Sequence, residues 1–482
     1  MSRASARRPR TVSRALVASA LLALCLVGST GVAEPRPSAL TGGPAGAAPT
    51  AVPPVGGATA TEPGAALPVP LPAPGTDTAP ATGSMPPPPP GAGGAATAAP
   101  SSGPSASGTA AAGATAGRTE ALVVAGARGD IPVERFGAVG DGVTDDTAAL
   151  QKALDTVPTG SILRLRAGAT YLHSDVLRVR TPGLTVLGRG ATVTATQETR
   201  SAFHVDADRV VVEGVTFALA TSTERFHAYE QMKVRVSADG VVLREVHVRG
   251  AAAAGFYVGN GSGDFLLDRV TVVGSRADGV HVTGGAHDGR VVSPVTTDTG
   301  DDGVAVVSYR ADGVPCARVE ISSPQVNGTT WGRGISVVGG DDITYTDVAV
   351  RDTDAAGVYV GSEGDPYYTF PSRRVRISRG TVTGANTNPA KDHGAVLVYA
   401  GHSGTTTADV TIRDLAVSGT RPGASWELGV LADPGAGVQR VTFSGISLTG
   451  GPTRPFHTNA SPAVRLFDVS DDGAAVPEHR GW

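Results

Sequence analysis

A short phrase recurs seven times between residues 253 and 434: two residues, a glycine, and then hydrophobic residues that alternate with others. The copies read AAGFYV, ADGVHV, DDGVAV, GRGISV, AAGVYV, DHGAVLV and ELGVLA. Their glycines lie 24, 24, 31, 23, 37 and 35 residues apart, at Gly255, Gly279, Gly303, Gly334, Gly357, Gly394 and Gly429. A second alternating phrase, such as FLLDRVTV, precedes each copy. Alternation with a period of two predicts strands rather than helices, and a recurring unit of this length predicts a solenoid.

Coils built from two or three short strands cannot close a core alone, so they must stack on their neighbours. We therefore predict an all-β fold, a parallel β-helix whose coils lie about 4.8 Å apart. Equivalent residues of successive coils then form columns. The column before the glycine is predicted to hold Ala254, Asp278, Asp302, Arg333, Ala356, His393 and Leu428, and the adjacent column Ala253, Ala277, Asp301, Gly332, Ala355, Asp392 and Glu427.

The composition divides the chain into four parts. Residues 1–33 have the pattern of a signal peptide, with five arginines, an apolar run at 15–28 and the small residues GVA at 31–33. That run is too short for a membrane span. Residues 34–120 are rich in Ala, Pro and Gly and are expected to form a disordered linker. The β-helix domain is predicted at 121–470 and a C-terminal tail at 471–482, in a secreted protein that the linker could hold at a cell wall.

Charge and cysteine content restrict the partners. The formal net charge is −4, and removal of the five signal arginines makes it about −9, which argues against nucleic acid as a partner. Cys316 is the one cysteine outside the signal segment, so no disulfide within the chain is expected. We expect a monomer stabilised by stacked coils.

The segment FGAVGDGVTDDTAALQKAL, at 136–154, predicts a helix that covers the open end of the solenoid. Thr144 is its expected N-cap, and Asp145 and Asp146 are expected to stabilise its positive end rather than to catalyse a reaction. Leu150 and Leu154 belong to its apolar face.

Three carboxylates are predicted to meet on adjacent coils: Asp278, Asp301 and Asp302. Like charges this close do not all ionise together, so one carboxyl should keep its proton near neutral pH. Glycoside hydrolysis needs this division, since one group protonates the departing oxygen and another activates water. The structural alternative is turn formation, because Asp-Gly is common in turns.

The phrase at 136–154 resembles the start of the pectate-lyase-like superfamily, which implies a right-handed parallel β-helix. The phrases ADGVHV, TGDDGVAV and WGRGISV resemble, in order and spacing, motifs of the polygalacturonase-type glycoside hydrolases. Those enzymes carry Asn-Thr-Asp-Gly, Asp-Asp, Gly-His-Gly and Arg-Ile-Lys on successive coils and hydrolyse with inversion. The resemblance implies that Asp301 is the general acid and that Asp278 and Asp302 activate water.

The sequence departs from those motifs at four places. Arg333 stands in place of the His, Ala277 in place of the Thr, and Tyr359 and Gly361 in place of the Arg and Lys. In the family the last two residues grip the carboxylate of the substrate. Their absence favours a neutral or differently linked glycan, with Arg333 as a substitute anion contact or as the residue that keeps Asp302 ionised.

The remaining candidates for substrate binding are aromatic or polar residues on the same face. Tyr257, His281 and Tyr359 are predicted to share one outward column suited to sugar stacking. The loops 221–231 and 361–373 are expected to form the walls of the cleft. The candidates are Arg333, Tyr257, His281, Tyr359, Asp392, His393, Tyr367 and Tyr368.

Two other functions stay open at this point. A polysaccharide lyase or epimerase acting on a uronate-containing glycan would use Arg333 or His393 as base or carboxylate ligand. A non-catalytic glycan-binding protein is the other alternative. No cofactor and no metal site are predicted, although calcium would suit carboxylates and carbonyls on coil turns.

Overall fold

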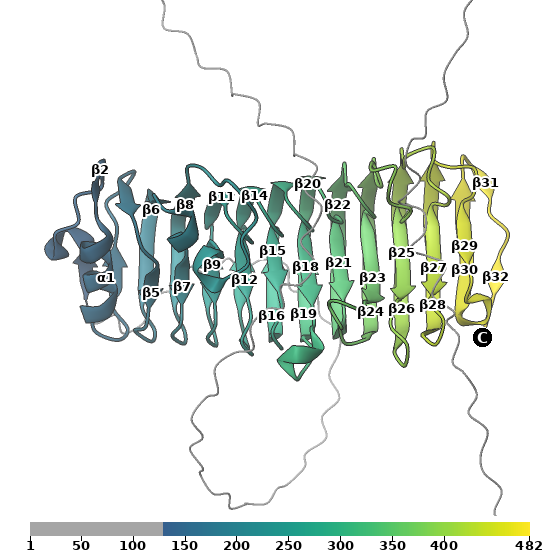
Figure 1. Ribbon diagram of the computed structural model, residues 1–482, viewed down its shortest axis with the longest axis horizontal. Helices are drawn as coiled ribbons and strands as arrows, with labels where there is room; N and C mark the ends of the chain where they lie inside the picture. Colours follow the sequence, from purple (N-terminus) through teal and green to yellow (C-terminus); the bar gives the residue numbers. More distant parts are fainter. Residues whose placement is uncertain (1–128) are drawn as a thin grey trace, which may run out of the picture. The chain divides into compact units, whose positions relative to one another are not determined.

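The computed structural model describes residues 129–482, so the predicted signal peptide, the whole predicted linker and residues 121–128 of the predicted β-helix domain lie outside the described residues. These residues form stacked coils of short strands (Figure 1), which confirms the predicted all-β parallel β-helix. No helix within residues 129–482 is long and apolar enough to cross a membrane. Short 3₁₀ turns interrupt the coils at η1 (Val133–Phe136), η2 (Glu198–Arg200), η3 (Tyr229–Gln231), η4 (Arg310–Asp312) and η5 (Ser461–Ala463).

One sheet carries the recurring phrase. Its eleven strands pair in parallel, each with the strand of the next coil. In order they are β5 (Leu177–Val179), β7 (Phe203–Val205), β9 (Val234–Val236), β12 (Phe256–Val258), β15 (Val280–Val282), β18 (Val304–Val307), β21 (Ile335–Val338), β23 (Val358–Ser362), β25 (Val396–Ala400), β27 (Leu428–Ala432) and β29 (Phe456–Thr458). We call this sheet the short-strand sheet.

The remaining strands form one sheet of 21 strands, in which most coils contribute either two strands or one long one. They are β1 (Asp130–Pro132), β2 (Asp141–Asp145), β3 (Ile162–Arg164), β4 (Thr170–His173), β6 (Thr185–Ala195), β8 (Val211–Leu219), β10 (Val242–Arg244), β11 (His247–Ala251), β13 (Leu266–Asp268), β14 (Thr271–Ser275), β16 (His287–Val292), β17 (Val295–Thr299), β19 (Ala317–Ser322), β20 (Gln325–Thr329), β22 (Gly340–Arg351), β24 (Ser372–Thr383), β26 (Thr406–Ser418), β28 (Gly437–Thr449), β30 (Val464–Asp471), β31 (Ala474–Ala475) and β32 (His479–Arg480).

The repeated glycine has a packing reason. A Cβ atom added at Gly279 would lie 2.5 Å from Cγ2 of Thr296, and one added at Gly303 would lie 2.6 Å from Cγ1 of Val326. Only glycine therefore lets the short-strand sheet approach the opposite strands at these points. The flanking valines, such as Val280 and Val304, are fully buried and form the core.

The predicted N-terminal helix is present as α1 (Thr147–Thr156), with Leu150 and Leu154 buried in the core. Its predicted N-cap is wrong: Thr144 lies in β2, where its hydroxyl donates to Asp141 at 2.9 Å, and the N-cap position belongs to Asp146. The Asp146 carboxylate instead accepts backbone N–H groups of the chain before the helix, at 2.6 and 3.0 Å.

The register confirms the predicted columns as far as coil β23 and corrects them beyond it. Val358 pairs with Val396 and Leu428, so Ala395 and Glu427 occupy the glycine position of their coils. The predicted column positions of His393, Leu428, Asp392 and Glu427 are therefore wrong by one or two residues, because the last two copies start their strands at a different distance from their glycine.

The end of the chain returns to the solenoid. Strands β31 and β32 pair antiparallel with β30, Ser470 with Ala475 and Arg465 with Arg480. The predicted tail at 471–482 thus folds back onto the last coil.

Candidate active site

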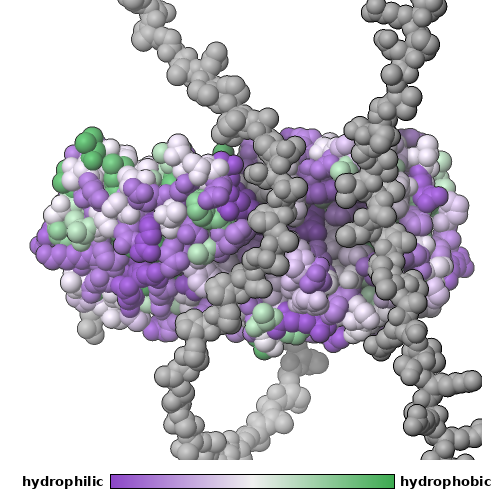
Figure 2. All heavy atoms as spheres, in the orientation of Figure 1, coloured by the Kyte–Doolittle hydropathy of each residue, from purple (hydrophilic) through white to green (hydrophobic). Residues whose placement is uncertain are grey.

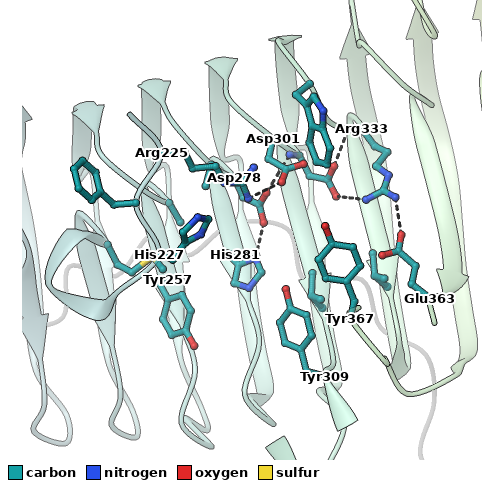
Figure 3. Close-up of a pocket in the computed structure, with 18 residues that line it drawn as sticks. Arg225, His227, Tyr257, Asp278, His281, Asp301, Tyr309, Arg333, Glu363 and Tyr367 are labelled. Carbon is teal, nitrogen blue, oxygen red and sulfur yellow. Dashed lines mark hydrogen bonds and ion pairs between the residues drawn. The ribbon is translucent and has the colours of Figure 1, made fainter. Parts of the chain in front are cut away.

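The three predicted carboxylates lie together at the floor of a cleft of about 180 Å³ (Figure 3). Asp278 precedes β15, and Asp301 and Asp302 precede β18 on the next coil. Each is at most 9% exposed. Residues 24 apart in the sequence thus become neighbours through the parallel pairing of β15 with β18.

Asp278 is held on both oxygens. Its Oδ1 accepts the backbone N–H of Asp302 at 3.1 Å, and its Oδ2 bonds Nδ1 of His281. The His281 ring stacks on Tyr257, with 5.5 Å between ring centroids, and lies 6.5 Å from the ring of Tyr309. These contacts fix the imidazole so that Nε2 is the ring nitrogen left without a contact to the carboxylate.

Asp302 is held in the same way by the following coil. Its Oδ1 accepts the backbone N–H of Arg333 at 2.6 Å, and its Oδ2 accepts the hydroxyl of Ser336 at 2.5 Å. The Arg333 guanidinium lies 3.7 Å from the same Oδ2. Burial raises the pKa of Asp302, while the Arg333 charge and these hydrogen bonds oppose that increase.

Asp301 has a different environment. It forms an ion pair with Arg225, whose Nη2 lies 2.8 Å from Oδ2. Burial, together with the charges of Asp278 and Asp302, raises the pKa of Asp301 to about 7, although Arg225 and Arg333 act against this. Such a carboxyl can both give and take a proton near neutral pH.

The Arg333 guanidinium interacts with two carboxylates rather than with solvent. Its Nη2 lies 2.6 Å from Oε1 of Glu363, and its guanidinium lies 4.3 Å above the ring of Tyr359. Burial lowers the pKa of Arg333, but the charges of Asp302 and Glu363 outweigh it and keep the group charged.

The other predicted binding residues differ in position. The register confirms that Tyr257, His281 and Tyr359 share one column. Tyr257 and His281 line the cleft, whereas Tyr359 is 2% exposed and lies under Arg333, so its ring face is not open to a sugar. Tyr367 lines the cleft and is 49% exposed. Tyr368 packs edge-on against His402 instead.

Asp392 and His393 lie outside the lining of the cleft. The Asp392 carboxylate accepts the backbone N–H of Ser425 at 2.8 Å. The His393 ring stacks on Tyr359 at 6.0 Å. Burial and the nearby charges of Arg333 and Lys391 lower its pKa to about 3, so His393 is neutral.

Several lining residues were not singled out from the sequence. Arg225, His227 and Glu363 come from the two loops predicted as walls, but their individual roles were not predicted. Trp331, which precedes the GRG phrase, is 51% exposed. Lys391 Nζ lies 4.3 Å from the centre of the Trp331 ring. The remaining ones are Tyr309 and the apolar Phe226, Met232, Val307 and Val338.

The visible face of the described residues is mostly polar. Figure 2 shows hydrophilic residues over most of the visible face, with hydrophobic residues in small, scattered groups. Within residues 129–482 no group of three or more His, Cys, Asp or Glu side chains is placed to hold a metal ion.

Residues 131–361 match the family model described as rhamnogalacturonase A/epimerase, pectate lyase-like. This part of the chain is accordingly similar to a pectate lyase-like domain. No curated protein matches the sequence significantly.

Solved structures show the same fold at low identity. The catalytic domain of Agl-KA is 18% identical, with a TM-score of 0.57, over 72% of this chain and 66% of that one. A GH87 α-1,3-glucanase catalytic domain in complex with nigerose is 14% identical, with a TM-score of 0.51, over 70% of this chain and 65% of that one. The A-module of the Azotobacter vinelandii mannuronan C-5 epimerase AlgE6 is 14% identical, with a TM-score of 0.50, over 72% of this chain and all of that module. The chain thus spans about two thirds of the first two.

Proposed function

We propose that this protein is a secreted glycoside hydrolase that cleaves a polysaccharide in the cleft above Asp278, Asp301 and Asp302. The observation that supports it best is the environment of Asp301, a buried carboxyl between two others whose pKa is raised to about 7. Asp301 gives its proton to the glycosidic oxygen as the bond to the anomeric carbon breaks. A water oxygen bonds to that carbon, and Asp278 or Asp302 takes the proton of the water. Inversion is the outcome that the family resemblance implies.

A neutral glycan suits the charges of the cleft. Four carboxyl groups line it, those of Asp278, Asp301, Asp302 and Glu363, against the two guanidinium groups of Arg225 and Arg333. Both guanidinium groups are already paired, Arg225 with Asp301 and Arg333 with Asp302 and Glu363. A uronate carboxylate would therefore have to compete with an internal carboxylate for either cation.

A polysaccharide lyase or epimerase is the second candidate. The contact between Asp278 and His281 favours it, because a histidine held by a carboxylate can abstract a proton next to a uronate carboxyl. That reaction also needs a cation that binds the uronate carboxylate. Either guanidinium group in the cleft could bind it only by giving up a carboxylate with which it is now paired. A glycan-binding protein without catalysis is the third possibility.

The test is incubation of the full chain with a panel of neutral and acidic polysaccharides, including an α-1,3-glucan, mannuronan and polygalacturonate. New reducing ends without ultraviolet absorbance support hydrolysis. Absorbance from an unsaturated product identifies a lyase, a change of sugar configuration alone an epimerase, and binding without turnover a binding protein.

Asp301→Asn should abolish the release of reducing ends, and near-normal activity in this variant would refute the assignment. Asp264→Asn is the matched control, since Asp264 is exposed, lies outside the cleft and has a positive φ that Asn tolerates.

A further inference from the structure

The site does not continue into an open groove along the solenoid. The outward column of the short-strand sheet would form the floor of such a groove, and it is covered on both sides of the carboxylates. Within this column Tyr257 is 5% exposed, Ala305 0%, Ser336 1% and Tyr359 2%. Toward β9, Tyr229 of η3 packs edge-on against Tyr257 at 5.6 Å. Toward β25, Arg333 covers Tyr359.

The wall from loop 221–231 reaches across two coils. Arg225 pairs with Asp301, and its guanidinium lies 5.9 Å from the ring of Trp331 on the coil beyond. The backbone of the same loop is tied to the coil of β14, where Arg276 donates to the carbonyl of Ser222. The wall therefore crosses the carboxylates rather than standing beside them (Figure 3).

The opposite wall is also fixed to the solenoid. Thr369 of loop 361–373 forms an antiparallel bridge with Tyr309, and the N–H of Arg310 donates to the carbonyl of Tyr368 at 2.9 Å. This places Tyr309 and Tyr367 together on one side of the cleft, with Glu363 beside Arg333 at the end (Figure 3). Side chains thus bound the cleft toward both ends of the solenoid and on both flanks.

The volume agrees with a short binding site. About 180 Å³ is available, whereas pockets that hold a drug-sized ligand measure about 300–1,000 Å³. The space is of the order of a single sugar ring, and both paths along the column are covered.

We infer that the site receives the end of a glycan chain and that the protein acts as an exo-enzyme, releasing one or two sugar units at a time. This inference rests on the proposed hydrolase function. The terminal sugar lies between Trp331 and Tyr367, over Asp301, and the rest of the chain leaves toward solvent.

The experiment follows the products over time from two substrates. One is the polysaccharide of the panel from which most reducing ends are released, and the other is a hexasaccharide of the same glycan, tagged at its reducing end. An exo-enzyme produces one short product from the first minutes and little loss of viscosity per bond cleaved. A ladder of intermediate lengths with a rapid fall in viscosity would overturn the inference while leaving hydrolysis established.

If no polysaccharide of the panel is cleaved, the proposed function fails, and binding tests the inference separately. Calorimetry of the Asp301→Asn chain with oligosaccharides of α-1,3-glucan, mannuronan and polygalacturonate is expected to give a dissociation constant that stops improving at two sugar units. Tightening by more than tenfold between two and six units, or no binding of any length, would overturn it.

The wall itself can be tested by Arg225→Ala, which removes the side chain that crosses the carboxylates. It is expected to produce a mixed set of early products, as internal segments gain access. Glu224→Ala is the matched control, because Glu224 is exposed on the same loop and does not line the cleft. Unchanged single-size products in the Arg225 variant would contradict the role of this wall.

Discussion

Replacing Asp301 by Asn should abolish activity and yet stabilise the protein at alkaline pH. The pKa of Asp301 is raised from 3.8 to about 7 in the folded chain by burial and by two neighbouring carboxylates. A group whose pKa is higher in the folded state contributes stability at low pH, below its unfolded pKa. That contribution is lost as the pH rises from about 4 to about 7. Asn does not titrate, so the variant does not lose stability over this pH range.

The size of the effect follows from the shift. A difference of about 3 units at about 1.36 kcal/mol per unit gives roughly 4 kcal/mol as an upper limit at pH 8. The side chain is 13% exposed, so solvent screening reduces this only modestly. The pKa of about 7 already includes the opposing effect of the Arg225 charge, so the ion pair is not subtracted again. We expect a net gain of about 3 kcal/mol at pH 8 and none at pH 4.

The assay is urea unfolding of wild type and Asp301→Asn at pH 4, 6 and 8, followed by tryptophan fluorescence and circular dichroism. Asp145→Asn provides a control of opposite sign. Hydrogen bonds from Ser174 and Thr147 lower the pKa of Asp145, so its contribution is present above about pH 4 and the variant should lose stability at pH 8. An Asp301 variant that is less stable than wild type at pH 8, or a difference that does not change with pH, would refute the electrostatic account of the site.

Four further outcomes are expected. Glu427→Gln should raise stability by up to about 3 kcal/mol above pH 7 and leave it unchanged near pH 4, measured by urea unfolding, because burial raises the pKa of Glu427 to about 7. Gly332→Ala should reduce activity at least tenfold, since its Cβ would lie 2.4 Å from the carbonyl carbon of Asp301. Arg333→Met should cost about 3–5 kcal/mol by leaving the buried Asp302 and the half-buried Glu363 without their cation, and a loss below 1 kcal/mol in urea unfolding would contradict this. EDTA should leave the melting temperature unchanged, and a fall would indicate a calcium site.

The fold and the carboxylate cluster could be predicted because both depend on strict periodicity. The coils that carry Asp278 and Asp302 differ by 24 residues. The next strand begins at Ile335, directly after its glycine, although 31 residues separate Gly303 from Gly334, so that counting from the glycines gives the true register. Each of these glycines also has a steric reason to remain glycine. A repeated residue with a packing reason is a reliable marker of equivalent positions.

Counting from the glycines gives the wrong register where another residue occupies the glycine position of the coil. Ala395 occupies the glycine position of its coil, and the nearby Gly394 misleads the count by one residue. In the next coil Gly429 lies inside the strand, and the buried Glu427 occupies the glycine position. The last two copies therefore still resemble the repeat in sequence, although their glycines are not structurally equivalent to the earlier ones.

The loops that form the cleft walls could be predicted from the sequence, but the contacts made by their side chains could not. Arg225 reaches Asp301 from a loop whose residues follow no repeat, and the two are 76 positions apart in the sequence. The burial of Tyr359 likewise depends on the side chain of Arg333 lying over its ring. Contacts made by long side chains from irregular loops are not encoded by a period.

The hydrogen bonds of the three carboxylates divide their tasks. Asp278 accepts the backbone N–H of Asp302, and Asp302 accepts that of Arg333, so each supports the stacking of the next coil. Both donors are backbone groups that cannot move without separating the coils. Asp301 is instead paired with the side chain of Arg225, on a loop. It is therefore the carboxyl whose proton can be exchanged without disturbing the solenoid, which is the property that a general acid requires.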